Sequence, residues 1–382
     1  MTLNTVAIIG AGPAGLMTAL KIKELGFDVN VFEAHESIGE PIHCSGLISK
    51  KGVEELELNL SDSLQNEIKG AKIFSPSGHV IKIKRKETVA YVVDRKKFDE
   101  MLVRKARLHN IHVATSTKLI DVRKNTLFVQ SENRGELRKA EYIIGADGVN
   151  STVRHLIELK APKENLVHTM QATISGQFDK SMVEIHFSDY AKGFFGWVIP
   201  ISAEKAKVGI GTTLGEDINQ NYRAFVKQRL PNSRIYKVDS ALIPCGPPLT
   251  GITKENIAIV GDAAFQTKAT TGGGIIFGMK SANILGNVVA DAIKNKTMLG
   301  DYEKRLDKIN KELKLHWKIR KYLNSISSKE IDDLFLKLKQ KGIEEFLEHE
   351  GDMDEPSKFI GKLATNPKYF FLAGTFLKFL TS

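Results

Sequence analysis

The chain has little cysteine and no long apolar run. Its 382 residues include only two cysteines, Cys44 and Cys245, too few for a disulfide framework, and this scarcity favours a reducing cytoplasm. No stretch approaches the ~20 consecutive apolar residues that span a bilayer. The first apolar run, Val6–Gly10, lacks the basic segment that begins a signal peptide. These absences predict a cytoplasmic protein without a membrane-spanning helix.

The composition is that of a folded protein with an excess of basic residues. A hydrophobic content of 42% with 26% charged residues is typical of globular proteins, and this length favours two packed domains. The formal net charge of +10 can favour nucleic acid, an anionic membrane surface or anionic ligands. Because no nucleic-acid-binding module accompanies the charge, we expect no nucleic-acid partner.

The first 35 residues contain a dinucleotide-binding fingerprint. A short apolar strand is followed by Gly10-Ala11-Gly12-Pro13-Ala14-Gly15 and then by a helical stretch. In such a turn, Gly10 permits the tight bend, Gly12 lets the backbone approach a pyrophosphate, and Gly15 allows close helix–strand packing. Glu33 ends the second strand, where a carboxylate accepts a hydrogen bond from a ribose 2′-hydroxyl. The pattern predicts a β-α-β unit that binds a dinucleotide without a 2′-phosphate.

Two further loops, each with an aspartate, follow buried strands later in the chain. They are Gly145–Arg154 and Gly261–Ala264. Segment 167–243 between them is rich in strand patterns, and segment 71–93 interrupts the chain earlier in the same way. The strands of one nucleotide-binding sheet are therefore predicted to alternate along the chain with those of an inserted antiparallel sheet.

Together, the three motifs resemble those of the aromatic-hydroxylase-type flavoproteins, a superfamily that includes the geranylgeranyl reductases of lipid biosynthesis. The resemblance covers roughly residues 1–300, with the motifs in the same order. It implies FAD as the cofactor. The glycine turn alone would fit NAD as readily as FAD, so the two later loops decide the cofactor.

The resemblance also implies the division of the chain. The predicted fold class is α/β (α+β), with a discontinuous Rossmann-like FAD-binding domain, an inserted antiparallel β-sheet substrate domain and a C-terminal helical region. The FAD-binding domain is expected to comprise 1–70, 94–160 and 255–300, the β-rich substrate domain 71–93 and 161–254, and the helical region 301–382.

Most of the expected site residues are implied by the resemblance. Arg95 stands where the superfamily places an arginine near the pyrophosphate, and Leu119 stands where a backbone contact to the adenine is expected. The glycines of Thr271–Gly274 could direct N–H groups at the N1–C2=O edge of the flavin and stabilise its anionic reduced form. No metal site is expected. The set expected to bind FAD is Gly10, Gly12, Pro13, Ala14, Gly15, Glu33, Cys44, Ser45, Leu47, Arg95, Leu119, Asp147, Asp262, Gly272, Gly273, Gly274 and Ile275.

The loop after Asp262 departs from the reductase pattern. The family usually has a glycine after the Asp-Ala-Ala sequence and Asn-Pro before the threonine–glycine run. Here those positions carry Phe265, Lys268 and Ala269. The departure leaves open the shape of the loop beside the flavin ring, and with it the exact substrate and electron donor.

Pro41–Gly46 resembles the cysteine-bearing loop of the reductases, which runs past the isoalloxazine ring. An isolated trisubstituted alkene is not activated for direct hydride attack, so protonation should assist hydride delivery. Cys44 is therefore the candidate catalytic proton donor. A small buried hydrophobe is the alternative role of a free cysteine.

Phe195–Pro200 resembles the aromatic-rich element of the geranylgeranyl reductases. It would line the substrate cavity with flat apolar surface, so Trp197 and Pro200 are the expected substrate-contact residues. Flavin halogenases carry a similar Trp-x-Ile-Pro segment, and aromatic side chains on a strand are often plain core. The motif by itself is therefore only moderately selective between the two enzyme classes.

The function expected from these motifs is FAD-dependent hydrogenation of carbon–carbon double bonds in geranylgeranyl (isoprenoid) chains, such as those of archaeal-type membrane ether lipids. The alternatives are an FAD-dependent monooxygenase or halogenase acting on an aromatic or other apolar small molecule, and a flavin-binding scaffold without turnover. Because the chain has no second dinucleotide fingerprint, electrons are expected from an external donor, either NAD(P)H, ferredoxin or another protein.

The C-terminal segment Tyr369–Leu380 is strongly apolar but too short to span a bilayer. We expect it to pack against the fold or to dock on the substrate cavity. A second interpretation follows from the basic stretch 304–321 upstream, namely peripheral contact with the inner face of the cell membrane.

Overall fold

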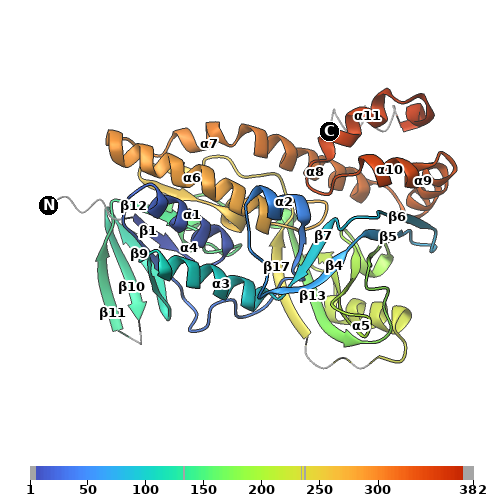
Figure 1. Cartoon of the computed structure of the whole chain (residues 1–382), viewed down its shortest axis with the longest axis horizontal. Helices are drawn as coiled ribbons and strands as arrows, with labels where there is room; N and C mark the ends of the chain where they lie inside the picture. Colours follow the sequence, from blue (N-terminus) through green and yellow to red (C-terminus); the bar gives the residue numbers. More distant parts are fainter. Residues whose placement is uncertain (1–5, 132–133, 234, 236–237, 373–382) are drawn as a thin grey trace.

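The computed structural model describes residues 6–131, 134–233, 235 and 238–372. Within them, a six-stranded, mainly parallel sheet with its helices forms one end of an elongated molecule, and a seven-stranded, mainly antiparallel sheet forms the other (Figure 1). The last helices of the chain run along one side of both parts. This arrangement confirms the predicted fold class.

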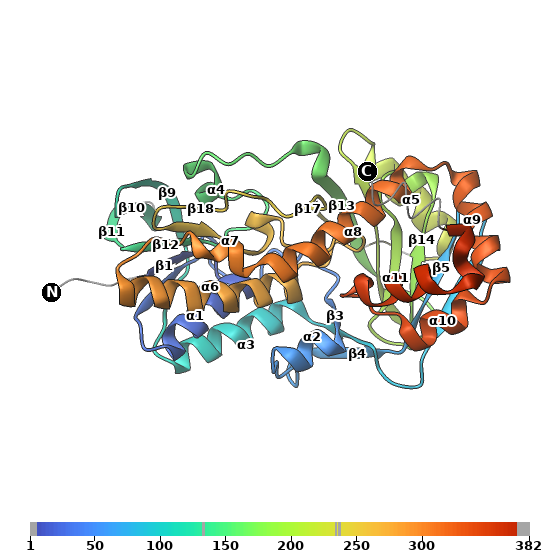
Figure 2. The ribbon, with the colours of Figure 1, turned by 90° about the horizontal axis from the view of Figure 1, so that it is seen from above.

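The six-stranded sheet is buried on both faces. Every residue of β1 (Val6–Ile9) is buried, because α1 (Pro13–Glu24), α3 (Arg95–Leu108) and α6 (Ile275–Asn295) cover one face and a small antiparallel sheet covers the other (Figure 2). The other strands, in the sheet order β18-β19-β12-β1-β2-β8, are β18 (Thr253–Lys254), β19 (Ile257–Ile259), β12 (Tyr142–Gly145), β2 (Val29–Phe32) and β8 (His112–Ala114).

The parallel neighbours β12, β1 and β19 place three loops at one edge of the sheet. The glycine turn follows β1, the Asp147 loop follows β12, and the Asp262 loop, which forms the 3-10 helix η3 (Gly261–Ala264), follows β19. The carboxyl ends of parallel strands are where ligands bind in sheets of this kind. Three segments that are distant in the sequence therefore meet at one place.

The sheet that covers the other face is a three-stranded meander. Residues 119–138 have the pattern of a single hairpin in the sequence, whereas the structure has three strands: β9 (Thr117–Arg123), β10 (Thr126–Ser131) and β11 (Arg134–Lys139). No residue of β11 is fully buried. The strand therefore lacks the alternation of apolar and polar residues by which a strand is recognised in a sequence.

The seven-stranded sheet has the order β17-β13-β16-β15-β14-β5-β6. Within the strand-rich segment 71–93, β5 (Gly70–Phe74) and β6 (Val80–Lys84) form an antiparallel hairpin. One face of the sheet packs against α5 (Ile218–Arg229) through buried apolar side chains. The remaining strands are β13 (Leu166–Ser175), β14 (Met182–His186), β15 (Gly196–Pro200), β16 (Lys205–Thr213) and β17 (Val238–Pro244).

The strands of the two large sheets alternate along the chain. The seven-stranded sheet uses segments 70–84 and 166–244, and the parallel sheet uses segments on both sides of each. The parallel sheet is therefore built from discontinuous segments, in agreement with the predicted fold class, while the exact domain bounds stay a prediction. The remaining elements of this part of the chain are β3 (Leu47–Ser49), α2 (Lys50–Glu55), β4 (Leu64–Ile68), β7 (Ala90–Val93), α4 (Thr152–Leu156), η1 (Lys163–Asn165) and η2 (Asp189–Ala191).

The last part of the chain is helical, as predicted. One of these helices, α10 (Ile343–Glu350), covers the edge of the seven-stranded sheet, because the backbone N–H groups of Lys82 and Lys84 in β6 donate hydrogen bonds to the carboxylates of its Glu344 and Glu348. These contacts protect an edge that would otherwise be open for pairing with another strand. The elements are α7 (Asp301–Arg305), α8 (Asp307–Ser325), α9 (Ser328–Gln340), α10 (Ile343–Glu350), α11 (Pro356–Thr365) and η4 (Pro367–Leu372).

Most of the apolar C-terminal segment lies outside the described residues, which end at Leu372. Tyr369 at its beginning is buried, and its ring lies 5.5 Å from that of Phe346 in α10. In the described part of the chain, no helix is both long and apolar enough to cross a membrane.

A buried ion pair in the seven-stranded sheet gives a prediction for acid stability. Arg229 of α5 donates two hydrogen bonds, of 2.6 and 2.7 Å, to the carboxylate of Glu184 in β14, and His186 Nε2 lies 3.0 Å from the same group. Burial opposes ionisation, but these hydrogen bonds lower the pKa of Glu184 from 4.5 to about 2. The stabilisation is present above pH 4.5 and is lost as the pH falls towards 2.

We expect the Glu184→Gln variant to be less stable at pH 7 and to have a flatter acid limb. The wild-type free energy of unfolding should fall by up to about 3 kcal/mol more than that of the variant between pH 5 and pH 2. Urea unfolding followed by circular dichroism at several pH values measures the difference. The control is Glu204→Gln, at an exposed position, and parallel acid limbs for wild type and Glu184→Gln would contradict the assignment.

Candidate functional site

The glycine turn has the shape that a bound pyrophosphate requires. A Cβ atom at Gly10, whose φ is +103°, would lie 2.3 Å from the carbonyl oxygen of Ala146, and one at Gly15 would lie 2.1 Å from the carbonyl oxygen of Gly10. Neither position accepts a side chain. A Cβ at Gly12 would meet no atom within 4 Å. The packing thus needs glycine at two positions, and the third borders open space.

The N-terminus of α1 and Glu33 frame that open space. No side chain caps the helix, so its first N–H groups are available to an anion. One carboxylate oxygen of Glu33 accepts the Ala11 N–H at 2.9 Å, and the other lies 2.9 Å from the backbone N and 2.7 Å from Nδ1 of His35. These bonds hold Glu33 beside the glycine turn, where the sequence predicted a ribose contact.

Asp147 and Arg154 organise the second loop. The carboxylate of Asp147 accepts hydrogen bonds from the Ser151 hydroxyl, at 2.5 Å, and from two backbone N–H groups at the start of α4. The buried Arg154 guanidinium donates to the carbonyl oxygens of Val149, at 2.6 Å, and Ala263, at 3.1 Å. The Asp147 side chain shapes its own loop, and Arg154 ties that loop to the Asp262 loop.

The carboxylate of Asp262 accepts no hydrogen bond from the described residues. Burial raises the pKa of Asp262, and the positive charge of Arg95 opposes that effect. A Cβ at Gly274 would lie 2.6 Å from Asp262 Oδ1. A half-buried carboxylate without a donor fits a hydroxyl group of a ligand, and a ribityl chain supplies such hydroxyls.

The segment Phe265–Gly274, here called the flavin loop, leads into α6. Its ends are joined by the pair Lys268 and Gly273, in which the Lys268 N–H donates to the Gly273 carbonyl oxygen at 3.1 Å. Gly272 has a φ of +70°, and a Cβ there would lie 2.5 Å from Ile243. No side chain caps α6. The N–H groups at this helix start are therefore available to an electron-rich group, and their contact with the flavin stays a prediction.

Cys44 lies among cationic groups. Its Sγ accepts the Gly46 N–H at 3.3 Å, and the side chains of Arg95 and Lys207 interact with it electrostatically. Arg95 is paired with Asp99, at 2.9 Å, while its Nε is buried without an acceptor. The Lys207 ammonium donates to the carbonyl oxygen of Ser45 at 2.9 Å, and burial lowers its pKa.

Beside these groups lies a buried cluster of aromatic side chains, here called the aromatic wall, formed by Phe194, Phe195 and Trp197. Phe194 and Phe195 are stacked with centroids 4.1 Å apart, and Trp197 meets both rings edge-on. A Cβ at Gly209 or Gly211 of β16 would lie 2.4 Å from the Trp197 ring or 2.5 Å from the Phe194 ring. Glycines in the neighbouring strand therefore leave the space that the Trp197 and Phe194 rings occupy.

The aromatic wall adjoins the flavin loop, because a Cβ at Gly272 would lie 3.3 Å from the Phe194 ring. The Trp197 indole N–H is buried without an acceptor among the described residues, and Leu47 packs against the same apolar cluster. The structure thus brings together the Cys44 loop, the flavin loop and the Trp197 segment. Other predicted residues lie near these groups or in core positions: Pro13 and Ala14 in the first turn of α1, Leu119 in β9, Pro200 at the end of β15 and Ile275 at the start of α6.

Four residues at the site were missed from the sequence. Arg154, Lys207, His316 and Arg320 are all buried, with at least one contact to a predicted loop. For Arg154 a signal existed, because it lies inside the Gly145–Arg154 motif. The other three stand in unremarkable strand or helix patterns, and only long-range contacts reveal them.

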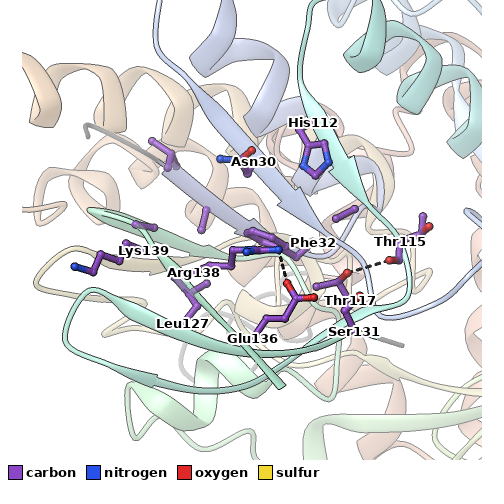
Figure 3. A pocket seen from close by; sticks show the side chains of 14 residues that line it. Asn30, Phe32, His112, Thr115, Thr117, Leu127, Ser131, Glu136, Arg138 and Lys139 are labelled. Atoms are coloured by element: carbon purple, nitrogen blue, oxygen red, sulfur yellow. Dashed lines mark hydrogen bonds and ion pairs between the residues drawn. The ribbon is translucent and has the colours of Figure 1, made fainter. Parts of the chain in front are cut away.

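A separate cavity of about 320 Å³ lies between the parallel sheet and the meander (Figure 3). Its lining includes His112 of β8, Thr117 of β9 and Arg138 of β11, and Arg138 is ion-paired with Glu136. None of the residues predicted for FAD or substrate lines it. Within the described residues, no cluster of three or more histidine, cysteine, aspartate or glutamate side chains could hold a metal ion.

The chain is similar to FAD-binding proteins in sequence. Residues 4–241 match the family described as FAD binding domain. The digeranylgeranylglycerophospholipid reductase of Methanocaldococcus jannaschii is 31% identical over 86% of this chain and 89% of its own length. The enzyme of the same name from Methanothrix thermoacetophila is 28% identical over 88% and 92% of the two chains.

Solved structures show the same fold. A geranylgeranyl bacteriochlorophyll reductase-like protein of Thermoplasma acidophilum superposes with a TM-score of 0.85 at 21% identity, over 97% of this chain and 99% of its own. A flavin-dependent brominase superposes with a TM-score of 0.71 at 16% identity, over 94% and 97% of the two chains. Fold alone therefore does not separate reduction from halogenation.

The different surroundings of Gly12 and Gly15 predict different consequences of adding a methyl group. Gly12→Ala should leave the stability of the FAD-free protein unchanged, because the position has ordinary dihedral angles and open space. It should weaken FAD binding at least ~10-fold, since the methyl group occupies the pyrophosphate side, a loss of about 1.4 kcal/mol. Gly15→Ala should destabilise the FAD-free protein itself by about 1–3 kcal/mol.

Thermal unfolding of the FAD-free proteins and titration with FAD, followed by flavin fluorescence, separate the two effects. Gly135→Ala is the matched control, because a Cβ there meets no atom and its φ is not positive. Wild-type FAD affinity in Gly12→Ala would show that the pyrophosphate does not approach this turn.

Proposed function

Because the chain belongs to the FAD-binding flavoprotein family that includes the digeranylgeranylglycerophospholipid reductases, we propose that it hydrogenates the carbon–carbon double bonds of geranylgeranyl chains in archaeal-type membrane ether lipids. The observation that carries this proposal is the similarity to enzymes with that name, which extends along nearly the whole chain.

The aromatic wall supports a polyprenyl substrate. Phe194, Phe195 and Trp197 form a buried apolar cluster beside the flavin loop, and an isoprenoid chain that packs against such a cluster needs no polar partners. Lys207 and Arg95 lie at the Cys44 loop rather than on this surface. A long apolar chain could therefore lie along the wall and present one double bond at a time.

The residues around Cys44 support a proton-assisted reduction. Reduced FAD, when bound, supplies a hydride, and an external electron donor restores the reduced state. Addition of hydride to one alkene carbon and of a proton to the other converts C=C to CH–CH. We propose that Cys44 donates this proton, that Lys207 holds the Cys44 loop through the Ser45 carbonyl oxygen, and that the uncapped N–H groups at the start of α6 favour the anionic reduced cofactor.

We expect dithionite-reduced protein with FAD to add hydrogen to a digeranylgeranylglycerophospholipid in steps of two mass units, measured by mass spectrometry. Cys44→Ser should retain FAD and lower the rate of the alkene reduction about 100-fold, because the hydroxyl is a much weaker acid. Absence of any mass increment with lipids of several chain lengths would refute the reductase. Hydroxylated or halogenated products from an aromatic compound with oxygen would favour the alternative enzyme classes.

We further propose that the protein acts at the cytoplasmic face of the membrane, as a peripheral protein. A groove of about 1370 Å³ lies between β6 and α10. Several lysines in or beside β6 line the groove. The described residues form no ion pair with these lysines. The carboxylates of Glu344 and Glu348 instead accept hydrogen bonds from backbone N–H groups of β6. The basic side chains of the groove are Lys69, Lys82, Lys84, Arg85, Lys86, Lys180 and Lys339. An excess of unpaired positive charge favours an anionic lipid surface.

We expect the triple variant Lys82→Gln/Lys84→Gln/Lys86→Gln to bind vesicles of anionic lipid at least ~10-fold more weakly than wild type, since each lysine contributes about 1 kcal/mol near such a surface. Sedimentation with phosphatidylglycerol vesicles, compared with neutral phosphatidylcholine vesicles, measures the effect. The control changes three exposed lysines elsewhere, Lys105, Lys118 and Lys124. Equal loss of binding in both triple variants would assign it to net charge rather than to the groove.

A further inference from the structure

Lys268, at one of the positions where the chain departs from the reductase pattern, forms a buried ion pair. Its Nζ lies 2.5 Å from Oδ1 of Asp354, and the two side chains are 6% and 1% exposed. The other carboxylate oxygen of Asp354 accepts the Ser49 hydroxyl. Lys268 Nζ also lies 3.4 Å from the Met353 carbonyl oxygen. The flavin loop is thus joined to the segment between α10 and α11 by two charges that are shielded from water.

The next contact along the flavin loop is made by His316 of α8. Its Nε2 lies 3.1 Å from the carbonyl oxygen of Asp354, and its Nδ1 lies 2.6 Å from the Thr270 hydroxyl. Burial, assisted by the positive charge of Lys268, lowers the pKa of His316 to about 4, so the ring is neutral at pH 7. A carbonyl oxygen only accepts, so Nε2 carries the proton and Nδ1 accepts the Thr270 hydroxyl.

Arg320, one turn further along α8, holds the residue between these two. Its Nη1 donates to the carbonyl oxygen of Ala269 at 3.2 Å, and its guanidinium lies 4.2 Å above the Phe194 ring of the aromatic wall. Residues 268–270 of the flavin loop therefore each contact a residue of the C-terminal region. The loop position is set by that region as much as by α6.

The Lys268 ammonium lies next to Gly273 of the flavin loop. A Cβ at Gly273 would lie 3.0 Å from Lys268 Cε and 3.5 Å from Nζ, and no atom of Asp354 is among its nearest neighbours. The positive end of the ion pair thus faces the glycines, and the negative end lies towards the C-terminal helices. In a site of low dielectric, an orientation of charge such as this acts on a nearby ligand.

We propose that Lys268 and Asp354 are positioning residues for FAD, which fix the flavin loop and set the charge behind it. The inference rests on the proposed function only in placing the flavin ring at this loop. The lysine favours the reduced, anionic flavin, and the aspartate limits that preference. Removal of either charge should therefore change the relative affinity for reduced and oxidised flavin, and the two changes should have opposite signs.

The test is the midpoint potential of bound FAD, measured by redox titration of the purified flavoprotein without lipid. Asp354→Asn leaves the lysine charge uncompensated and should raise the potential. Lys268→Met leaves the aspartate charge and should lower it. A tenfold change in relative affinity in each direction corresponds to about 30 mV for a two-electron couple. The double variant Lys268→Met/Asp354→Asn should return close to the wild-type potential.

Lys51→Met is the matched control, because Lys51 pairs with Asp352 and Glu355 of the same segment without touching the flavin loop. Its potential should equal that of wild type. If the two residues have a purely structural role, both single variants should lose FAD and should shift the midpoint potential in the same direction. That result would overturn the proposal, and so would unchanged midpoint potentials. If the wild-type protein binds no FAD, the proposed function itself fails, and the two failures are thereby distinguished.

Discussion

The site depends on the close approach of two backbone segments at the edge of the parallel sheet. The turn at Gly10 comes so near to Ala146 that no side chain fits between them, and Arg154 joins the Asp147 loop to the carbonyl oxygen of Ala263. Backbone geometry and one buried guanidinium therefore hold three loops in register before any cofactor is present. Gly12 is left beside open space, while Gly10 and Gly15 are in tight backbone contacts.

Local patterns in the sequence were sufficient for the parts of the fold that depend on local physics. Glycine spacing, short apolar strands and an acidic strand end predicted the β-α-β unit, and the structure has all of them. The exposed strand β11 was missed because no residue of it is fully buried. Lys207, His316 and Arg320 were missed for a different reason. Their contacts join segments far apart in the chain, and a single sequence contains no record of such distances.

Trp197 shows how far a motif can be interpreted on its own. The sequence predicted an aromatic contact residue, and the ring does belong to the aromatic wall. Its orientation, however, is set by Gly209 in the neighbouring strand, where any side chain would collide with the indole. The pairing of Trp197 with Gly209 across β15 and β16 is a property of the sheet register. The position of the indole ring is therefore determined by residues of two neighbouring strands.

Three basic residues from separate parts of the chain converge on the short segment between α10 and α11. They are Arg85, which donates to the carbonyl oxygens of Leu347 and Gly351, Lys51, which pairs with Asp352 and Glu355, and Lys268, which pairs with Asp354.

Buried or half-buried ion pairs contribute little net stability compared with apolar contacts of the same volume, but a wrong register would leave their charges uncompensated. Apolar packing alone would permit the C-terminal helices to slide over the sheet, whereas these pairs fix one position. Because the aromatic wall and the flavin loop both contact Arg320 of the same region, the geometry of the substrate site follows from that position. The last part of the chain is therefore part of the candidate site, although it contributes no dinucleotide motif.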